Sequence, residues 1–303
     1  MFGMYGVCLI AAAALGCAAF YPRARRMGLH AAAAPALTAL CALMGALCGR
    51  AYLHITKYAI NGRGMWGYTV LSSRPYEYAV CGVILGVMLA AWIASKALKR
   101  SAWQLLDAMA PAALLALAAA RFGEYFADFG WGQVLEGGSL CFFPFAVSDM
   151  YGMWHAAVFM LEGALALAVF VYALCIRRER EGDAFRLALL WWCAAQVFCE
   201  SMRAETLRWG FVRVQQLQCA VFMLGLLITF TLRAKRLGLA KRTAPAYYVF
   251  VVGVGVVIFI EYALDKIQAM PVALCYGIMA AALCAMAGMI ARQRRLGEFK
   301  GYR

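Results

Sequence analysis

The stretch AAVFMLEGALALAVFVYAL, residues 156–174, is apolar apart from one carboxylate, Glu162. A helix needs roughly 20 apolar residues to cross a bilayer, so this stretch predicts a transmembrane helix. The whole chain has the same character: of its 303 residues, 65% are hydrophobic and 15% are charged. Soluble domains carry about 25% charged residues. The composition therefore excludes an ordinary soluble domain and predicts an all-α, polytopic transmembrane helical bundle.

Apolar runs on both sides of this stretch predict about nine spans. They cover residues 3–21, 31–54, 76–98, 104–122, 151–176, 185–203, 214–232, 246–264 and 270–291. Basic clusters occupy every second gap between them, at 22–26, 95–100, 177–180, 233–242 and 292–303. Because basic loops stay in the cytoplasm, this alternation predicts an outer N-terminus and a cytoplasmic C-terminus.

The net charge of +14 lies mostly in these short loop clusters. Clusters of this kind contact anionic headgroups, so the expected partners are membrane lipids, and no nucleic acid is expected. The twelve cysteines lie almost entirely within apolar runs and form no CxxC pair. The pattern therefore predicts no metal site, and nothing in it calls for a cofactor.

The segment LGLAKRTAP, residues 237–245, predicts a boundary between two parts of the chain. The first part, 1–236, contains seven of the predicted spans. The second part, 237–303, reads as an accessory two-helix hairpin with a basic tail. Few polar residues interrupt its two spans, so we expect it to contribute nothing to a functional site.

Charges and glycines gather in RFGEYFADFGWG, residues 121–132, at the end of a predicted span. On a continuing helix, Arg121, Glu124 and Asp128 would share one face, and the later glycines would turn the chain. Arginine binds oxyanions through two parallel hydrogen bonds, which suits a phosphate. The same spacing also fits an Arg–Glu ion pair that holds a helix end together. The residues alone leave both interpretations open.

Other ionisable groups lie within or at the ends of predicted spans, where each is a hypothesis of function. Glu162 is expected to pair with a neighbouring helix, with a proton relay as the alternative. Glu200 and Arg203 share one helix face, and Arg203 fits either headgroup binding or snorkelling to the interface. Arg50 allows the same two interpretations. His155 is a candidate base or an interfacial imidazole.

Five sequence features occur in an order that resembles a known family. They are Tyr5-Gly6, CGRAY with Arg50, ARFGEYFADFGWG with Arg121, Gly123 and Gly132, FMLEGALAL with Glu162, and ESMRAETLRWGFVRVQQ with Glu200 and Arg203. Over roughly residues 1–235 the chain resembles the prolipoprotein diacylglyceryl transferase family. It departs from that pattern at Glu124, where the family has asparagine, at Cys81, which replaces a histidine, and at Gln196, which replaces an arginine.

The resemblance implies transfer of diacylglyceryl from phosphatidylglycerol to the cysteine thiol of a preprolipoprotein lipobox, without metal or cofactor. It also implies that the protein lies in the bacterial inner membrane. It implies catalytic roles for Arg121, Glu124 and His155. Substrate binding would involve Tyr5, Arg50, Gly123, Gly132, Glu162, Glu200 and Arg203. The replaced positions favour a second hypothesis, a non-catalytic paralogue that binds phospholipid or the lipoprotein precursor. A small membrane transporter is the third.

Overall fold

A computed structural model describes residues 3–61, 78–135, 137–176, 180–209, 212–266 and 270–296. In these parts of the chain, each predicted span corresponds to a helix. The helices are α1 (Met4–Arg26), α2 (Ala33–Asn61), α3 (Val80–Leu98), α4 (Ala102–Gly123), α5 (Val158–Cys175), α6 (Asp183–Met202), α7 (Val214–Arg236), α8 (Ala244–Lys266) and α9 (Val272–Leu296). Most of the predicted outer loop 55–75 lies outside the described residues.

Eight of these helices are long and apolar enough to cross a membrane, which makes the chain a polytopic helical membrane protein. The exception within the described residues is α6, whose 20 residues include Asp183, Arg186 and Glu200. The fifth helix begins at Val158, later than the predicted 151, because Trp154–Ala156 form a β-strand.

The chain divides into two compact units. Unit 1 contains Met1–Ala188 and Arg203–Glu205, and unit 2 contains Leu189–Met202 and Thr206–Arg303. The division therefore falls within α6 and groups α7 with α8 and α9. The sequence instead predicted a boundary near 237, which groups α7 with the preceding spans.

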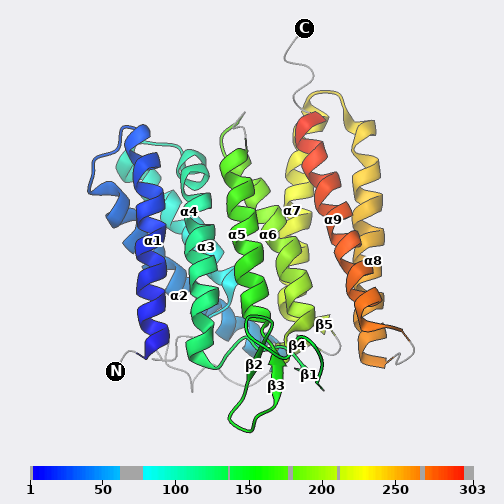
Figure 1. Ribbon diagram of the computed structural model, residues 1–303. Coiled ribbons are helices and arrows are strands. Elements are labelled where there is room, and N and C mark those ends of the chain that lie inside the picture. Colours follow the sequence, from blue (N-terminus) through cyan, green and yellow to red (C-terminus); the bar gives the residue numbers. More distant parts are fainter. Residues whose placement is uncertain are drawn as a thin grey trace. The chain divides into compact units, whose positions relative to one another are not determined.

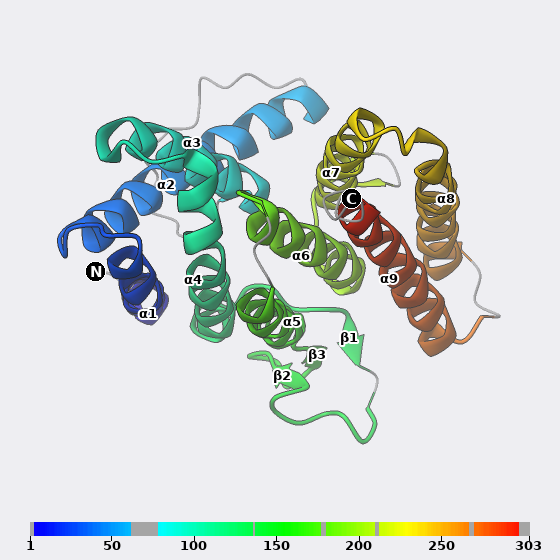
Figure 2. The same cartoon turned by 90° about the horizontal axis from the view of Figure 1, so that it is seen from above.

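Within unit 1, α4 lies between α1 and α5, and α2 packs along α3 (Figures 1 and 2). Small residues let these helices approach closely, as is common in membranes. At the α2–α3 contact, a Cβ atom added to Gly82 would lie 2.7 Å from the carbonyl oxygen of Cys48. Only glycine fits at that distance.

The end of unit 1 that contains the C-terminus of α4 has an irregular structure (Figure 1). After α4 the chain makes a short 3-10 helix, η2 (Glu124–Ala127), and then turns at Asp128, which has a φ of 47°. This turn corrects the expectation of one continuous helix face, since Asp128 is exposed and leaves the face of Arg121. A three-stranded antiparallel sheet of β1 (Val134–Leu135), β3 (Trp154–Ala156) and β2 (Ala146–Ser148) follows.

In unit 2, α9 packs against both α7 and α8, and a short hairpin of β4 (Arg208–Trp209) and β5 (Val212–Arg213) precedes α7. The 3-10 helix η3 (Ala240–Arg242) connects α7 to α8. Polar contacts join α9 to α7 and to the residue that precedes α8. The Gln293 amide accepts a hydrogen bond from Thr231 at 3.0 Å and donates one to the Thr243 carbonyl at 2.9 Å.

Candidate functional site

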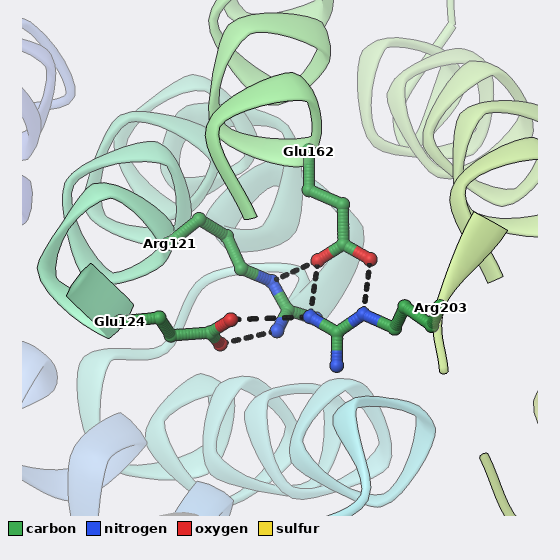
Figure 3. Close-up of polar contacts among 4 residues, drawn as sticks. All are labelled: Arg121, Glu124, Glu162 and Arg203. Carbon is green, nitrogen blue, oxygen red and sulfur yellow. Dashed lines mark hydrogen bonds and ion pairs between the residues drawn. The ribbon is translucent and has the colours of Figure 1, made fainter. Parts of the chain in front are cut away.

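Four ionised side chains meet at the end of unit 1 where α4 terminates: Arg121, Glu124, Glu162 and Arg203 (Figure 3). Arg203 binds Glu162 through two hydrogen bonds, from Nε at 2.8 Å and from Nη2 at 2.7 Å. Its Nη2 also contacts Glu124 at 3.1 Å. Arg121 pairs with Glu124 through Nη1 and with Glu162 through Nε, the latter at 2.9 Å. We call these four residues the Arg–Glu ring.

The positions of Arg121 and Glu162 follow from the close packing of α4 and α5. Phe122, next to Arg121, presses its ring against the backbone of Gly163, next to Glu162. A side chain at Gly163 would overlap that ring, so glycine sets the distance between the helices. Glu124 is the first residue of η2, one turn beyond Arg121, which gives the (i, i+3) pair.

Backbone contacts fix Arg203, which directly follows the last residue of α6. It forms an isolated antiparallel β-bridge with Gly132, and the next amide, of Ala204, donates to the Trp131 carbonyl at 3.1 Å. The Arg203 guanidinium also lies 5.5 Å from the centre of the Phe129 ring. Gly132 therefore acts through its backbone and brings Arg203 to the loop after α4.

Gly130 belongs to the same loop and has a φ of 78°, a conformation that favours glycine. A Cβ atom there would overlap the carboxylate of Glu124 and lie 3.2 Å from Nη2 of Arg203. The loop thus lies directly against the Arg–Glu ring.

All four ring side chains are at least nine-tenths buried, with relative exposures of 3–6%. Burying one charge costs several kcal/mol unless partners compensate it. Two guanidiniums and two carboxylates balance one another here, so the ring is neutral as a whole. The expected Arg121–Glu124 ion pair and the expected partner for Glu162 on another helix are both confirmed. A phosphate-binding role stays a prediction, because any oxyanion must share these arginines with the carboxylates.

Tyr5 and Gly123 lie beside the ring. Tyr5, on α1, lies within electrostatic range of Glu124, Arg121 and Arg203. A Cβ atom on Gly123 would lie 2.6 Å from the Cβ atom of Cys8 and 3.8 Å from the Tyr5 ring. Gly123 therefore lets α1 approach the end of α4, which places the tyrosine near the arginines.

The structure places Arg50 inside the protein. Its side chain is only 2% exposed, so of the two interpretations left open by the sequence, snorkelling to the interface is wrong. Its guanidinium lies 5.9 Å from the centre of the Tyr78 ring. The contacts that define the Arg–Glu ring do not include Arg50, and its role as a third oxyanion contact stays a prediction.

His155 lies on the central strand of the small sheet, away from the contacts of the ring. Its Nε2 lies 3.3 Å from Asp149, and its ring packs against Trp131 at 5.1 Å. Burial raises the pKa of Asp149, but hydrogen bonds from the Met153 amide, His155 and the Tyr151 amide outweigh this and lower that pKa below its usual value. His155 is thus paired with a carboxylate, and the described contacts do not join it to Arg121.

Unit 2 contains a second buried polar cluster, around Glu200, that the sequence did not predict. The Glu200 carbonyl accepts a hydrogen bond from Nη1 of Arg213 at 2.7 Å. Nε of Arg213 binds Glu261 of α8 at 3.1 Å, and Glu261 also accepts from Gln216 at 2.7 Å. Arg213 is 3% exposed, so its guanidinium lies inside the protein and is neutralised there by Glu261. The signal available in the sequence was a carboxylate inside an otherwise apolar span.

The described parts of the chain contain no group of three or more His, Cys, Asp or Glu side chains suited to a metal ion. The three positions at which the sequence departs from the pattern it resembles are all buried: Cys81 at 0% exposure, and Glu124 and Gln196 at 3% each. What the site offers chemically is a pair of arginines and a pair of carboxylates, shielded from water.

Comparison with known proteins matches most of the chain to a family. The family model described as prolipoprotein diacylglyceryl transferase matches residues 2–232, more than half of the chain. Three similar proteins, all named phosphatidylglycerol–prolipoprotein diacylglyceryl transferase, come from Listeria welshimeri, Clostridium novyi and Halalkalibacterium halodurans. The first is 33% identical over 162 residues, covering 50% of this chain and 58% of that protein.

The Clostridium novyi protein is 27% identical over 188 residues, covering 60% of this chain and 72% of that protein. The Halalkalibacterium halodurans protein is 30% identical over 178 residues, covering 55% and 61%. The match thus spans little more than half the length of the Listeria relatives. The extent of the family match nevertheless decides the classification: the chain belongs to the prolipoprotein diacylglyceryl transferase family.

Proposed function

We propose that this protein transfers the diacylglyceryl group of phosphatidylglycerol to the thiol of a lipobox cysteine in a preprolipoprotein. The observation that carries the proposal is the convergence of Arg121 and Arg203, from segments 82 residues apart, on the same two carboxylates. Family membership and the names of the relatives support the substrates. Membrane lipid and the lipobox segment are the proposed partners.

The reaction forms a bond between the cysteine sulfur and a glycerol carbon, and it breaks the bond from that carbon to the phosphate oxygen. Glycerol phosphate leaves, and its phosphate gains one negative charge. Buried guanidiniums stabilise charge that develops in this way, because fixed donors act strongly where water is excluded. Arg121 and Arg203 are the proposed donors, with Tyr5 beside them.

The thiol proton needs an acceptor, since the thiolate is the nucleophile. We propose Glu124 for this role, because its carboxylate contacts both arginines. A phosphate that takes over those arginine N–H groups leaves Glu124 without its partners, and a carboxylate that loses positive neighbours binds a proton more readily. Phosphate binding would thereby activate the base. Glu162, paired twice with Arg203, would remain as the anchor of that side chain.

The topology belongs to the same proposal. We propose that α6 is a ninth span, since 20 residues extend about 30 Å as a helix. The N-terminus and the Arg–Glu ring would then lie at the outer face of the inner membrane. In unit 1 the N-terminus of α1 and the small sheet lie at the same end (Figure 1), and α1 ends in Arg23, Arg25 and Arg26 at the other.

The test is turnover in liposomes that contain phosphatidylglycerol, with a lipobox peptide and mass spectrometry to detect the lipidated thiol. Wild-type protein is expected to modify the peptide. Arg203→Lys keeps the charge but cannot form the double hydrogen bond, so activity should fall by about 100-fold or more. The matched control is Arg208→Lys, at an exposed pair with Asp265, which should leave turnover unchanged. Absence of any lipidated peptide with wild-type protein would refute the proposal.

A non-catalytic paralogue is the second candidate, and one observation favours it. The Arg–Glu ring is already neutral, because Glu124 stands where the family has asparagine. A phosphate must compete with that extra carboxylate. Phosphatidylglycerol binding without peptide modification, in wild-type protein and in Glu124→Asn alike, would identify the paralogue. Loss of turnover in Glu124→Asn is expected if Glu124 is the base, whereas a gain would overturn that role and show that the carboxylate restrains the enzyme.

A further inference from the structure

A second group of arginines surrounds a cavity at the other end of unit 1. The cavity has a volume of about 460 Å³ and is lined by Arg26, Arg100, Arg180, Gln104, Asp107 and Glu181. Sites for small ligands typically have volumes of about 300–1,000 Å³. Gln104 and Arg121 both lie on α4, 17 residues apart, which corresponds to about 26 Å along a helix. The cavity therefore lies one membrane thickness away from the Arg–Glu ring.

The three arginines come from three separate segments. Arg26 ends α1, Arg100 follows α3, and Arg180 precedes α6. Arg100 is held in place, because its Nη2 donates to the Met27 carbonyl at 3.0 Å. Among the described residues, the side chains of Arg26 and Arg180 have no hydrogen bond or ion pair, and both are exposed. Their charges are thus available to a ligand.

The two carboxylates of the cavity already have partners. Asp107 accepts hydrogen bonds from the backbone amides of Gly182 at 2.7 Å and Phe185 at 2.9 Å. Glu181 accepts one from the Gln104 amide at 2.5 Å. Three arginines against two carboxylates leave one positive charge in excess in the lining. This excess is the main difference from the neutral Arg–Glu ring.

We propose that the cavity lined by Arg26, Arg100 and Arg180 binds a phosphate group. Guanidiniums from three separate segments suit the oxygens of a phosphate, and the Gln104 amide has a second N–H beside the one that it donates to Glu181. The phosphate has two possible sources, the headgroup of an anionic phospholipid in the adjacent leaflet and free phosphate. Both sources present the same phosphate oxygens, and a cavity at the end of a helix bundle is accessible to a lipid headgroup and to free phosphate. The proposal does not depend on transferase activity.

The test is native mass spectrometry of the full chain in neutral detergent, titrated with phosphatidylglycerol or with phosphatidylcholine. The variant Arg26→Gln/Arg180→Gln removes two of the cavity's charges. The matched control, Arg25→Gln/Lys99→Gln, removes two exposed charges at the same end of α1 and α3 that do not line the cavity. The Arg–Glu ring is intact in both, so lipid bound there cancels in the comparison. Thermal unfolding verifies that both variants fold.

The expected result is a loss of one class of phosphatidylglycerol adduct, with affinity lower by about tenfold or more, in the cavity variant alone. Equal weakening in both variants would indicate a diffuse surface charge and overturn the proposal, as would no change in either. A competition experiment with inorganic phosphate identifies whether the cavity binds free phosphate or a lipid headgroup. Displacement of the lipid adduct by millimolar phosphate supports a site for free phosphate, and resistance to it supports a headgroup site.

Discussion

The two ends of unit 1 use arginine in opposite ways. At one end Arg121 and Arg203 are buried and neutralised by two carboxylates. At the other end Arg26 and Arg180 are exposed around a cavity whose lining keeps a positive excess. The comparison shows that arginine content alone does not identify an anion site in a membrane protein. The number of carboxylates within hydrogen-bonding distance determines whether a guanidinium is fully paired within the protein or can bind an anion.

The difference also has an energetic consequence. A buried ion loses its hydration, so the ring depends on an equal number of opposite charges. An exposed arginine keeps much of its hydration, and removing its neighbours costs little. Variants at the ring should therefore affect stability first, and variants at the cavity should affect ligand binding first.

The largest expected effect is on stability in Glu162→Gln. The glutamine is nearly the same shape but leaves two buried guanidiniums facing Glu124 alone. We expect a loss of about 3–5 kcal/mol in the free energy of unfolding, measured by denaturation in detergent. The control is Glu181→Gln at the cavity, which is exposed and should lose less than about 1 kcal/mol.

Adding Arg121→Gln to Glu162→Gln provides a sharper test, because it restores neutrality. The double variant should be less destabilised than the sum of the two single variants. Simple additivity would show that side-chain shape, and not charge balance, determines how much the ring stabilises the protein. The contrast drawn between the two ends of unit 1 would then be wrong.

The next largest effect extends the comparison to unit 2, at Glu261→Gln. Glu261 is 11% exposed and binds the buried Arg213. Its neutralisation should cost about 2–3 kcal/mol of unfolding free energy. The control, Asp265→Asn, breaks an ion pair whose two side chains are each 40% exposed and should cost less than about 1 kcal/mol. Equal losses of unfolding free energy in the two variants would mean that burial does not determine how strongly these ion pairs stabilise the protein.

Local sequence patterns predicted much of the fold but only part of the site. Apolar runs gave all nine helices in the described residues, and the (i, i+3) spacing gave the pair Arg121–Glu124. Glu162 was expected to have a partner because an isolated carboxylate is costly in a membrane. Its partner Arg203 lies 41 residues away, and that choice depends on helix packing and on the Gly132 bridge. No local pattern carries that information.

The turn after α4 was predicted, but its first residue was placed too late in the sequence. The glycines after Arg121 predicted a chain reversal, but the reversal starts earlier, at the 3-10 helix and Asp128. The arginine cavity was missed, because its three arginines belong to separate basic clusters, each interpreted by itself as a marker of topology and a contact for lipid headgroups. A cluster's side chains become a site only where loops bring several clusters together.

A smaller loss of stability is expected for Gly130→Ala, in the loop that packs against the Arg–Glu ring. The added methyl would overlap the Glu124 carboxylate in a backbone with φ of 78°. The control is Gly152→Ala, whose φ is 80° and whose Cβ would meet no atom within 4 Å. Both variants strain the backbone, so their difference isolates crowding of the ring, which we expect to be about 1–3 kcal/mol of unfolding free energy. Equal stabilities would show that the carboxylate moves aside freely.

The smallest expected effect is at Asp149, which lies beyond the transmembrane helices and pairs with His155. Its carboxylate accepts hydrogen bonds from the amides of Tyr151 and Met153, both at 2.9 Å. Because these bonds lower its pKa in the folded state, its contribution is complete above the unfolded pKa of about 3.9 and is lost as pH falls through the folded pKa. Stability should therefore not change through this group between about pH 7 and 5.

Hydrogen–deuterium exchange of residues 149–156 measures that contribution directly. Asp149→Asn keeps a carbonyl acceptor for the two amides, whereas Asp149→Ala removes it. Exchange in this segment at neutral pH should be fastest in the alanine variant, and only wild-type protein should show further loosening below about pH 4. If Asp149→Ala exchanges like wild type, the turn is held by its strands alone. In that case the Asp149 carboxylate does not orient His155, and only the β-sheet keeps His155 away from the Arg–Glu ring.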